Sequence, residues 1–159
     1  GYGDHRVLLS FPTRGSSDRA IVGKNCVVGN SVELKNAVLF DNVQTPHYNY
    51  VGDSILGYKS HMGAGSITSN VKSDKSLVTV RTDDRVIATN LRKFGAMLGD
   101  YAEIGCNSVL CPGAVIGRGT TVYPTSCVRG FVPEHCVYKG PDRVVAKWKE
   151  TRKDEKDEK

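Results

Sequence analysis

The sequence predicts an all-β protein built as a parallel β-helix, in which very short strands wind into stacked three-sided coils. The first observation is a six-residue repeat of aliphatic side chains at Leu98, Ile104, Leu110, Ile116, Val122 and Val128. The second is a small residue four positions after each of the first five, at Ala102, Ser108, Ala114, Thr120 and Ser126. A period of six fits neither an amphipathic helix nor long strands, whereas it suits short strands joined by tight bends.

Two earlier runs extend the repeat toward the N-terminus. The first runs through Val22, Val28, Leu34 and Phe40, and the second through Val51, Leu56, Met62 and Thr68 with one five-residue step. Three hexads close one coil of about 18 residues, with the aliphatic side chains in a continuous core and glycine at the corners. A glycine-rich barrel or sandwich is the alternative, and the strict phase over six hexads argues against it. The repeat itself leaves the hand of the coil open, because general crossover preference favours right-handed connections.

Three segments fall outside the repeat. Residues 1–20 show no hexad phase and form an irregular segment before a β-helix domain over 21–140. Residues 72–93 hold two β-prone runs around Thr82-Asp83-Asp84, which predicts a protruding β-hairpin arm inserted in that domain. Residues 141–159 begin with Pro and end in a run of charges, which predicts a short C-terminal helix and a solvated tail. The residues expected to pack this helix are Val145 and Trp148.

Composition restricts the class of protein. The 159 residues are 39% hydrophobic and 25% charged, as expected of a soluble globular chain, and the formal net charge is +5. No apolar run approaches the ~20 residues of a membrane span, and no signal-peptide layout is present, so a cytoplasmic protein with no membrane partner is expected. The basic residues are scattered and aromatics are only 8% of the chain, which argues against a nucleic-acid partner.

The densest polar cluster lies between the two earlier runs and contains His47. This histidine follows Pro46 where the hexad count is disrupted, so its side chain is free to face outward. An imidazole there is eligible as a general base, although a lone histidine is more often a surface or capping residue. Glu33 and Lys35 precede it by about one coil, which places them near His47 unless they belong to a solvated strand face. A carboxylate can orient the imidazole, and a lysine can bind phosphate.

A second candidate is the corner Gly63-Ala64-Gly65, whose exposed amides suit an oxyanion. Repeat corners need glycine in any case, so the motif is weak on its own. The five cysteines form no C-x-x-C pair, which argues against a disulfide framework or a zinc site and favours small buried residues.

The combined motifs are much more specific than their parts. The run Pro46–Gly57 (PHYNYVGDSILG), followed by His61–Asn70 (HMGAGSITSN) and preceded by Gly29–Lys35 (GNSVELK), resembles one known family. It is similar to the acetyltransferase domain of the bifunctional glucosamine-1-phosphate acetyltransferase/N-acetylglucosamine-1-phosphate uridyltransferase. It also resembles the C-terminal domain of related sugar-1-phosphate nucleotidyltransferases. The likeness runs from about Ile21 to Lys139, and it implies a left-handed β-helix that forms homotrimers and binds acetyl-CoA between subunits.

The resemblance implies roles for individual residues. His47 matches the catalytic base, Glu33 the acidic residue beside it, and Ala64 the backbone amide that holds the oxyanion. The positions that match substrate contacts are Lys35, Tyr50, His61 and Asn70, and those that match CoA contacts are Ala64, Cys106, Tyr123 and Pro124. Three positions depart from the family pattern: His61 replaces asparagine, Cys106 replaces serine, and Val71 replaces an aromatic residue. The family's arginine one coil before Lys35 has no clear counterpart.

The resemblance therefore implies a CoA-dependent N-acetyltransferase that acts on an amino-sugar phosphate such as glucosamine-1-phosphate, in UDP-N-acetylglucosamine-type nucleotide-sugar synthesis. The transfer is direct, without an acyl-enzyme. The alternative is a noncatalytic trimerisation or regulatory module related to a sugar-1-phosphate nucleotidyltransferase. The sequence shows no Gly-rich phosphate loop, so nucleotidyl transfer is not expected from this chain alone, and a separate nucleotidyltransferase is a candidate partner. A γ-class carbonic anhydrase shares the coil, but it needs three zinc-binding histidines, and no two of His5, His47, His61 and His135 are close in sequence, so no metal is expected.

Overall fold

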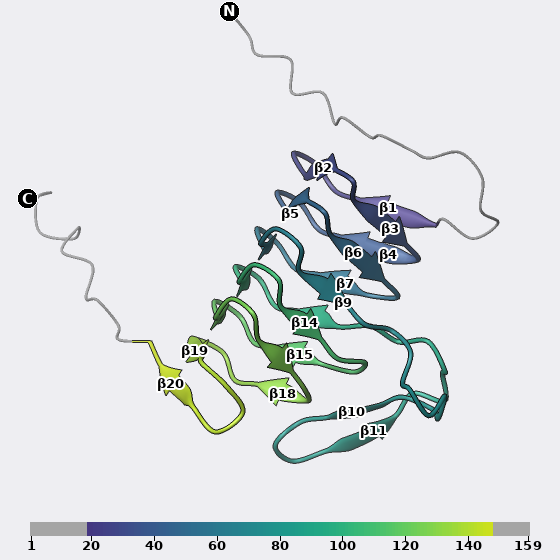
Figure 1. Ribbon diagram of the computed structural model, residues 1–159, viewed down its shortest axis with the longest axis vertical. Coiled ribbons are helices and arrows are strands. Elements are labelled where there is room, and N and C mark those ends of the chain that lie inside the picture. Colours follow the sequence, from purple (N-terminus) through teal and green to yellow (C-terminus); the bar gives the residue numbers. More distant parts are fainter. Residues whose placement is uncertain (1–18, 148–159) are drawn as a thin grey trace, which may run out of the picture.

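The computed structural model describes residues 19–147, which form twenty strands and contain no helix, and hence none that could cross a membrane. Most of the strands wind into stacked three-sided coils, in which each strand pairs in parallel with its equivalent in the next coil (Figure 1). The predicted parallel β-helix is confirmed. The left hand implied by the resemblance stays a prediction.

Three sheets form the three faces of the coil. The first face contains β1 (Ala20–Val22), β4 (Ala37–Leu39), β7 (Ile55–Leu56), β12 (Met97–Leu98), β15 (Val115–Ile116) and β18 (Phe131–Val132). The second face contains β2 (Val27–Asn30), β5 (Gln44–His47), β8 (His61–Met62), β13 (Glu103–Ile104), β16 (Thr121–Val122) and β19 (Cys136–Tyr138), with β20 (Val144–Ala146) at its edge. The third face contains β3 (Glu33–Lys35), β6 (Tyr50–Gly52), β9 (Ile67–Thr68), β14 (Val109–Leu110) and β17 (Cys127–Val128).

A column of aliphatic side chains fills the coil, as the repeat predicts. Its fully buried members include Leu39, Val51, Leu56, Met62, Ile104, Leu110, Ile116, Val122, Val128 and Val132. One predicted inward position is wrong, because Phe40 is 52% exposed and Leu39 takes its place in the core. Val22 pairs with Leu39, and Leu39 pairs with Leu56, so each of these coils contains 17 residues. The next inward residue after Leu34 is therefore five positions on, and not six.

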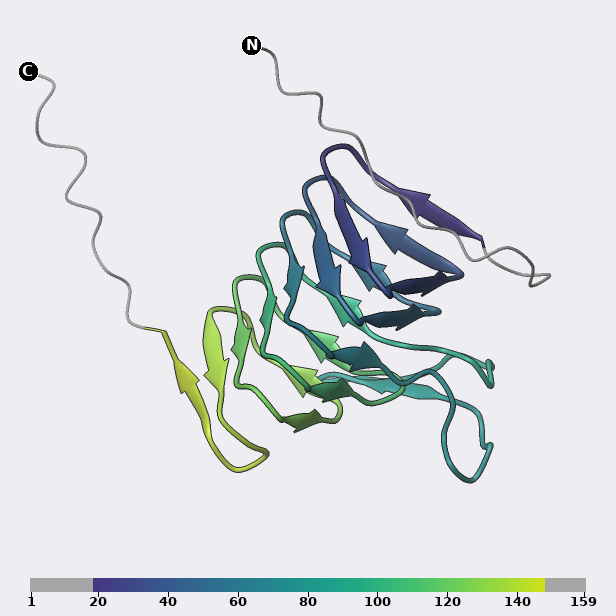
Figure 2. The same cartoon turned by 45° about the horizontal axis from the view of Figure 1, so that its top comes forward.

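The segment between β9 and β12 forms the predicted hairpin. Strands β10 (Thr79–Arg81) and β11 (Val86–Ala88) pair antiparallel, and Figure 2 shows them beside the coils. We call residues 72–93 the arm. Its first strand and the residue before it pack on the coil, because Val78 and Val80 are buried and a Cβ added at Gly113 would lie 2.6 Å from the Thr79 carbonyl oxygen. The arm therefore covers part of the third face.

Substitution of Gly113 by alanine tests this packing. The residue has a φ of 82°, so alanine brings backbone strain of about 1–2 kcal/mol as well as the clash with Thr79, whose relief costs about 1–3 kcal/mol more. Gly130 has a similar φ of 72° with nothing within 4 Å of an added Cβ, so Gly130→Ala is the matched control for strain alone. We expect Gly113→Ala, and not Gly130→Ala, to speed proteolytic cleavage of the arm. Equal cleavage rates in the two variants would show that the arm does not rest on Gly113.

The C-terminal part of the fold differs from the prediction. Residues 141–159 were expected to hold a short helix followed by a charged tail, but Val144–Ala146 form strand β20, which pairs antiparallel with β19. The turn at Gly140 and Pro141 reverses the chain, and β-branched Val144 and Val145 suit an added strand that pairs the open edge of the second face. Trp148 and the charged tail lie outside the described residues, as do residues 1–18 of the predicted irregular segment. Ala20 begins β1.

Candidate functional site

Five residues form one column where the second face turns into the third. This column consists of Asn30, His47, Ala64, Cys106 and Pro124, one from each successive coil, and we call it the histidine corner. Backbone hydrogen bonds join its coils, from Tyr48 N to Asn30 O (3.0 Å), Gly65 N to His47 O (3.0 Å), Asn107 N to Ala64 O (2.9 Å) and Thr125 N to Cys106 O (2.8 Å). The proposed base, the proposed oxyanion amide and three predicted CoA contacts thus follow one another along one edge.

Local backbone geometry turns this edge outward. The residue after each column member has a positive φ, at Ser31, Tyr48, Gly65, Asn107 and Thr125, so each coil bends sharply there. His47 is exposed, while Ala64 is half-buried. Gly63 keeps the coils close, because an added Cβ would lie 2.8 Å from both the Cys106 nitrogen and the Ile104 oxygen. The side chains of the histidine corner are therefore presented side by side on the outer edge.

Glu33 comes from the coil before His47 and from the same corner. The backbone of His47 pairs with that of Asn30, and Tyr50 pairs with Glu33, so the acid lies one step into the third face. Both side chains are exposed. The register therefore brings the backbones of Glu33 and His47 to one corner on neighbouring coils, and their predicted roles stay predictions.

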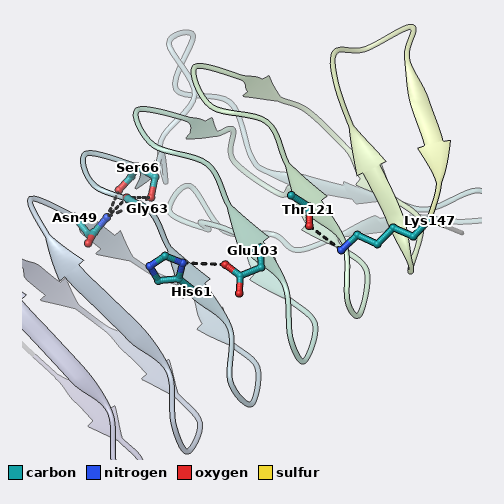
Figure 3. Close-up of polar contacts among 7 residues, drawn as sticks. All are labelled: Asn49, His61, Gly63, Ser66, Glu103, Thr121 and Lys147. Carbon is teal, nitrogen blue, oxygen red and sulfur yellow. Dashed lines mark hydrogen bonds and ion pairs between the residues drawn. The ribbon is translucent and has the colours of Figure 1, made fainter. Parts of the chain in front are cut away.

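Asn49 supports the histidine corner from inside, and sequence reasoning missed it. Its side chain is 2% exposed, and its amide Nδ2 donates to the Gly63 carbonyl (2.9 Å) and the Ser66 carbonyl (3.0 Å), as Figure 3 shows. Its Oδ1 accepts the His47 N–H at 3.2 Å. Asn49 occupies the small-residue position four places after the inward Thr45, so a large polar side chain at that position was the available signal. It ties His47 to the Gly63-Ala64 turn.

The predicted substrate residues Tyr50 and Asn70 meet on the third face. Asn70 Nδ2 donates to the Tyr50 hydroxyl (3.2 Å) and to Asp53 Oδ2 (2.5 Å), and Asp53 Oδ1 accepts from Asn36 Nδ2 (2.7 Å). Burial, followed by the nearby carboxylates, raises the pKa of the Tyr50 phenol despite its bond to Asn70. The Tyr50 ring lies over Gly52, where an added Cβ would approach the hydroxyl oxygen more closely than contact allows. The sequence did not single out Asp53 or Asn36.

Lys35 ends β3 beside this network, and its backbone pairs with Gly52. It lies where the third face turns into the first, at the next corner from His47. Lys35, Tyr50 and Asn70 therefore lie on the third face or at the edge where it turns into the first. Glu33 lies on the same face, at the edge next to the histidine corner.

His61 stands apart from the other predicted substrate residues. It begins β8 on the second face, where its Nδ1 lies 2.9 Å from Glu103 Oε2 (Figure 3). A carboxylate only accepts, so Nδ1 is the donor in this contact. Glu103 was missed because the arm separates it from His61 by 42 positions in sequence. One chain alone does not bring His61 to Tyr50 and Asn70.

Tyr123 and Pro124 lie at the mouth of a groove of about 590 Å³ on the C-terminal coils. Arg129 and Lys139 line it, and the Lys139 ammonium lies 5.2 Å from the centre of the Tyr123 ring. The two cations give this groove a positive charge that suits an anionic ligand.

A second groove of about 730 Å³ lies between the arm and the third face. Its walls include Arg81 from the arm and Arg129 from the coil, and its floor holds Cys111 and Cys127, whose sulfur atoms are 3.6 Å apart. We call it the arm groove. Burial, and then the hydrogen bond and charge of Cys127, raise the pKa of the Cys111 thiol from 9.0 to about 11. Within residues 19–147, no group of three His, Cys, Asp or Glu side chains is arranged to hold a metal ion.

The Cys111 thiol makes the stability of the reduced protein depend on pH. Between pH 9.0 and about 11 the unfolded chain loses this proton while the folded chain keeps it. The free energy of unfolding therefore falls as the pH rises through this window, and the contribution is intact below pH 9.0. We expect Cys111→Ser to reduce this fall in the free energy of unfolding, measured by urea unfolding at a series of pH values under reducing conditions. Cys106→Ser, which changes an exposed thiol, is expected to leave the fall unchanged. Identical slopes in wild type and Cys111→Ser would contradict this.

Comparisons with known proteins cover most of the chain. No family model matches it. The bifunctional protein GlmU of Methanococcus maripaludis is 34% identical over 128 residues, which are 80% of this chain and 31% of that protein. A bifunctional sugar-1-phosphate nucleotidylyltransferase/acetyltransferase of Sulfurisphaera tokodaii is 35% identical over 108 residues, 68% of this chain and 27% of that protein. Over this region the chain is a homologue of the GlmU proteins.

The similarity to GlmU confirms the resemblance predicted from the motifs. The chain spans about a third of the length of these curated relatives. A variant of perosamine N-acetyltransferase from Caulobacter crescentus, solved in complex with CoA and GDP-perosamine, shares the fold with a TM-score of 0.60 and 18% identity. The alignment covers 81% of this chain and 50% of that one. The coil architecture is thus one that occurs in sugar N-acetyltransferases.

Proposed function

We propose that the chain is an acetyl-CoA-dependent N-acyltransferase that acetylates the amino group of an amino-sugar phosphate, with glucosamine-1-phosphate as the first acceptor to test. The observation that carries the proposal is the histidine corner, where His47, Ala64, Cys106 and Pro124 follow one another on consecutive coils. Support also comes from the GlmU proteins and from the CoA-bound N-acetyltransferase that shares the fold.

The mechanism is a direct transfer. His47 accepts a proton from the acceptor amine as its nitrogen attacks the thioester carbonyl, the carbon–sulfur bond breaks, and CoA leaves as the thiol once it regains a proton. The Ala64 N–H suits the developing oxyanion, because it donates to no other described residue, whereas the Gly65 N–H is bonded to His47 O. Glu33 holds the imidazole or the amine in place.

The acceptor lies on the third face in this proposal. The Lys35 ammonium binds the phosphate, and Tyr50 and Asn70 bind the sugar through the network that Asp53 holds in place. His61 and its Glu103 partner lie on another face. We therefore propose a homotrimer, in which the second face of one copy completes the site at the histidine corner of its neighbour.

Acetyl-CoA-dependent thiol release tests the proposal. With glucosamine-1-phosphate as acceptor, thiol appears in proportion to the acceptor consumed, and mass spectrometry detects the N-acetylated product. N-Acetylglucosamine-1-phosphate, which has no free amine, is the matched control and releases no thiol. A panel of amino-sugar phosphates and nucleotide-linked amino sugars follows. No acceptor-dependent release across the panel would contradict the proposal and favour the noncatalytic module.

A further inference from the structure

Two thiols on neighbouring coils face each other in the arm groove. Cys111 follows β14, Cys127 begins β17, and their sulfur atoms are 3.6 Å apart. A disulfide needs about 2.05 Å, so the sulfurs must approach by roughly 1.5 Å. Cys127 is exposed and Cys111 is half-buried, whereas Cys26 and Cys136 are buried elsewhere in the coil. The regular stacking of the coils brings these two thiols together although 16 positions separate them.

The arm groove carries a positive charge around this pair. Lys72 and Arg81 from the arm and Arg129 from the coil line it, against a single carboxylate from Asp74. The Lys72 ammonium is held by the Leu77 carbonyl at 3.0 Å. Neither Arg81 nor Arg129 forms a salt bridge with another residue of the described range 19–147. The two guanidinium groups are therefore available to an anionic ligand that reaches the thiols.

From this geometry we infer that Cys111 and Cys127 form a redox-active dithiol that is oxidised to a disulfide by an anionic small-molecule disulfide bound in the arm groove. No step of the proposed acyl transfer involves these two thiols, although Cys127 also lines the groove beside Tyr123 and Pro124. The inference therefore does not rest on the proposed function.

The exchange proceeds in two balanced steps. The exposed Cys127, as thiolate, attacks one sulfur of the small disulfide, forming a mixed disulfide and releasing one thiolate, which takes up a proton. Cys111 then loses its proton and attacks the Cys127 sulfur of the mixed disulfide, releasing the second small thiol. Overall, one small disulfide is reduced to two thiols and two protein thiols are oxidised. Because burial raises the pKa of the Cys111 thiol, it suits the second, resolving role, in which its partner is already in contact.

The cross-link has a structural consequence. It adds a covalent link between two coils that are otherwise joined by the strand pairs β12–β15, β13–β16 and β14–β17, and it lies in the groove beside the arm. A disulfide that closes a loop of this length restricts the unfolded chain, so the oxidised protein unfolds at a higher temperature than the reduced one.

Intact-protein mass spectrometry after treatment with oxidised glutathione tests the inference. Wild type is expected to lose about 2 Da and to yield a peptide linked through Cys111 and Cys127. Cys111→Ser is expected to keep a glutathione adduct on Cys127, because no resolving thiol is left. Cys127→Ser is expected to react at Cys111 at least about tenfold more slowly, given its raised pKa. Cys106→Ser is the matched control for an exposed thiol outside the groove, and it retains the linked peptide.

Charge in the groove is tested separately. Arg129→Gln is expected to slow oxidation by anionic glutathione disulfide about threefold, and to leave oxidation by neutral hydroxyethyl disulfide unchanged. Equal slowing with both reagents would remove the anion-binding part of the inference. A stable glutathione adduct on wild-type Cys127, or no linked peptide in folded protein, would overturn the dithiol itself.

Discussion

Replacing His47 with alanine is expected to lower acetyl-CoA-dependent turnover about 10²- to 10⁴-fold, the range that a general base contributes. The imidazole lies on the exposed edge of the histidine corner, directly before the Ala64 turn of the next coil. Its side chain forms no hydrogen bond within residues 19–147, so the loss falls on kcat and leaves the fold intact. Steady-state kinetics with saturating acceptor, together with thermal unfolding of the variant, measure both quantities.

His135→Asn is the matched control for His47→Ala. His135 is also an exposed corner histidine, at the corner between the first and second faces. Unlike His47 it has a positive φ, of 53°, which asparagine tolerates. We expect the turnover of the His135→Asn variant to stay within about twofold of the wild-type value. Full activity in His47→Ala would remove His47 from the mechanism, and the His61–Glu103 pair would then become the candidate proton acceptor.

Asn49→Ala is expected to destabilise the protein by about 3 kcal/mol. The substitution removes a buried amide and leaves the Gly63 and Ser66 carbonyls and the His47 N–H without this partner, and each buried unsatisfied group costs about 1–3 kcal/mol. Part of the loss is offset because Ser66 Oγ still donates to the Gly63 carbonyl at 2.7 Å. Urea unfolding measures the change, and hydrogen exchange at Gly65 reports the loosened corner.

Asn30→Ala serves as the control for Asn49→Ala. It removes an exposed asparagine from the same corner, whose Oδ1 accepts only the Ser31 hydroxyl, so its effect is expected within about 0.5 kcal/mol. Asn49→Ala with wild-type stability would show that the amide does not hold the turn. The variant is also expected to lower kcat, because both His47 and the Ala64 amide move with the corner.

Much of the fold was predictable because the repeat reflects one physical requirement, an aliphatic side chain at each inward position. The same requirement explains the error at Phe40. Leu39 and Phe40 are adjacent apolar residues, so the count alone does not show which one faces inward when a corner takes five residues. Likewise, the run Val144–Ala146 suits either a short helix or an edge strand. It forms the strand because β19 offers unpaired backbone groups at the edge of the second face.

The candidate site was predictable where it follows the repeat and hidden where it does not. His47 and Ala64 lie on consecutive coils, so their proximity follows from the spacing. Glu103 lies beside His61 only because the arm is excluded from the coil, which a count along the sequence does not reveal. Asn49 was hidden for another reason, since its role depends on hydrogen bonds made inside the corner.

The arm leaves the coil at Asn70 and returns at Phe94, and the Phe94 N–H donates to the Asn70 carbonyl at 2.9 Å. The two ends of the insertion are thus pinned together, and Gly95 N–H bonds back to Asp53 O at 2.8 Å as the winding resumes. Since the entropy of closing such a loop grows only slowly with its length, this junction is expected to tolerate insertions of different length. Replacing the arm by another insert would change the residues that cover Cys111 and Cys127, and the coils on either side would keep their register.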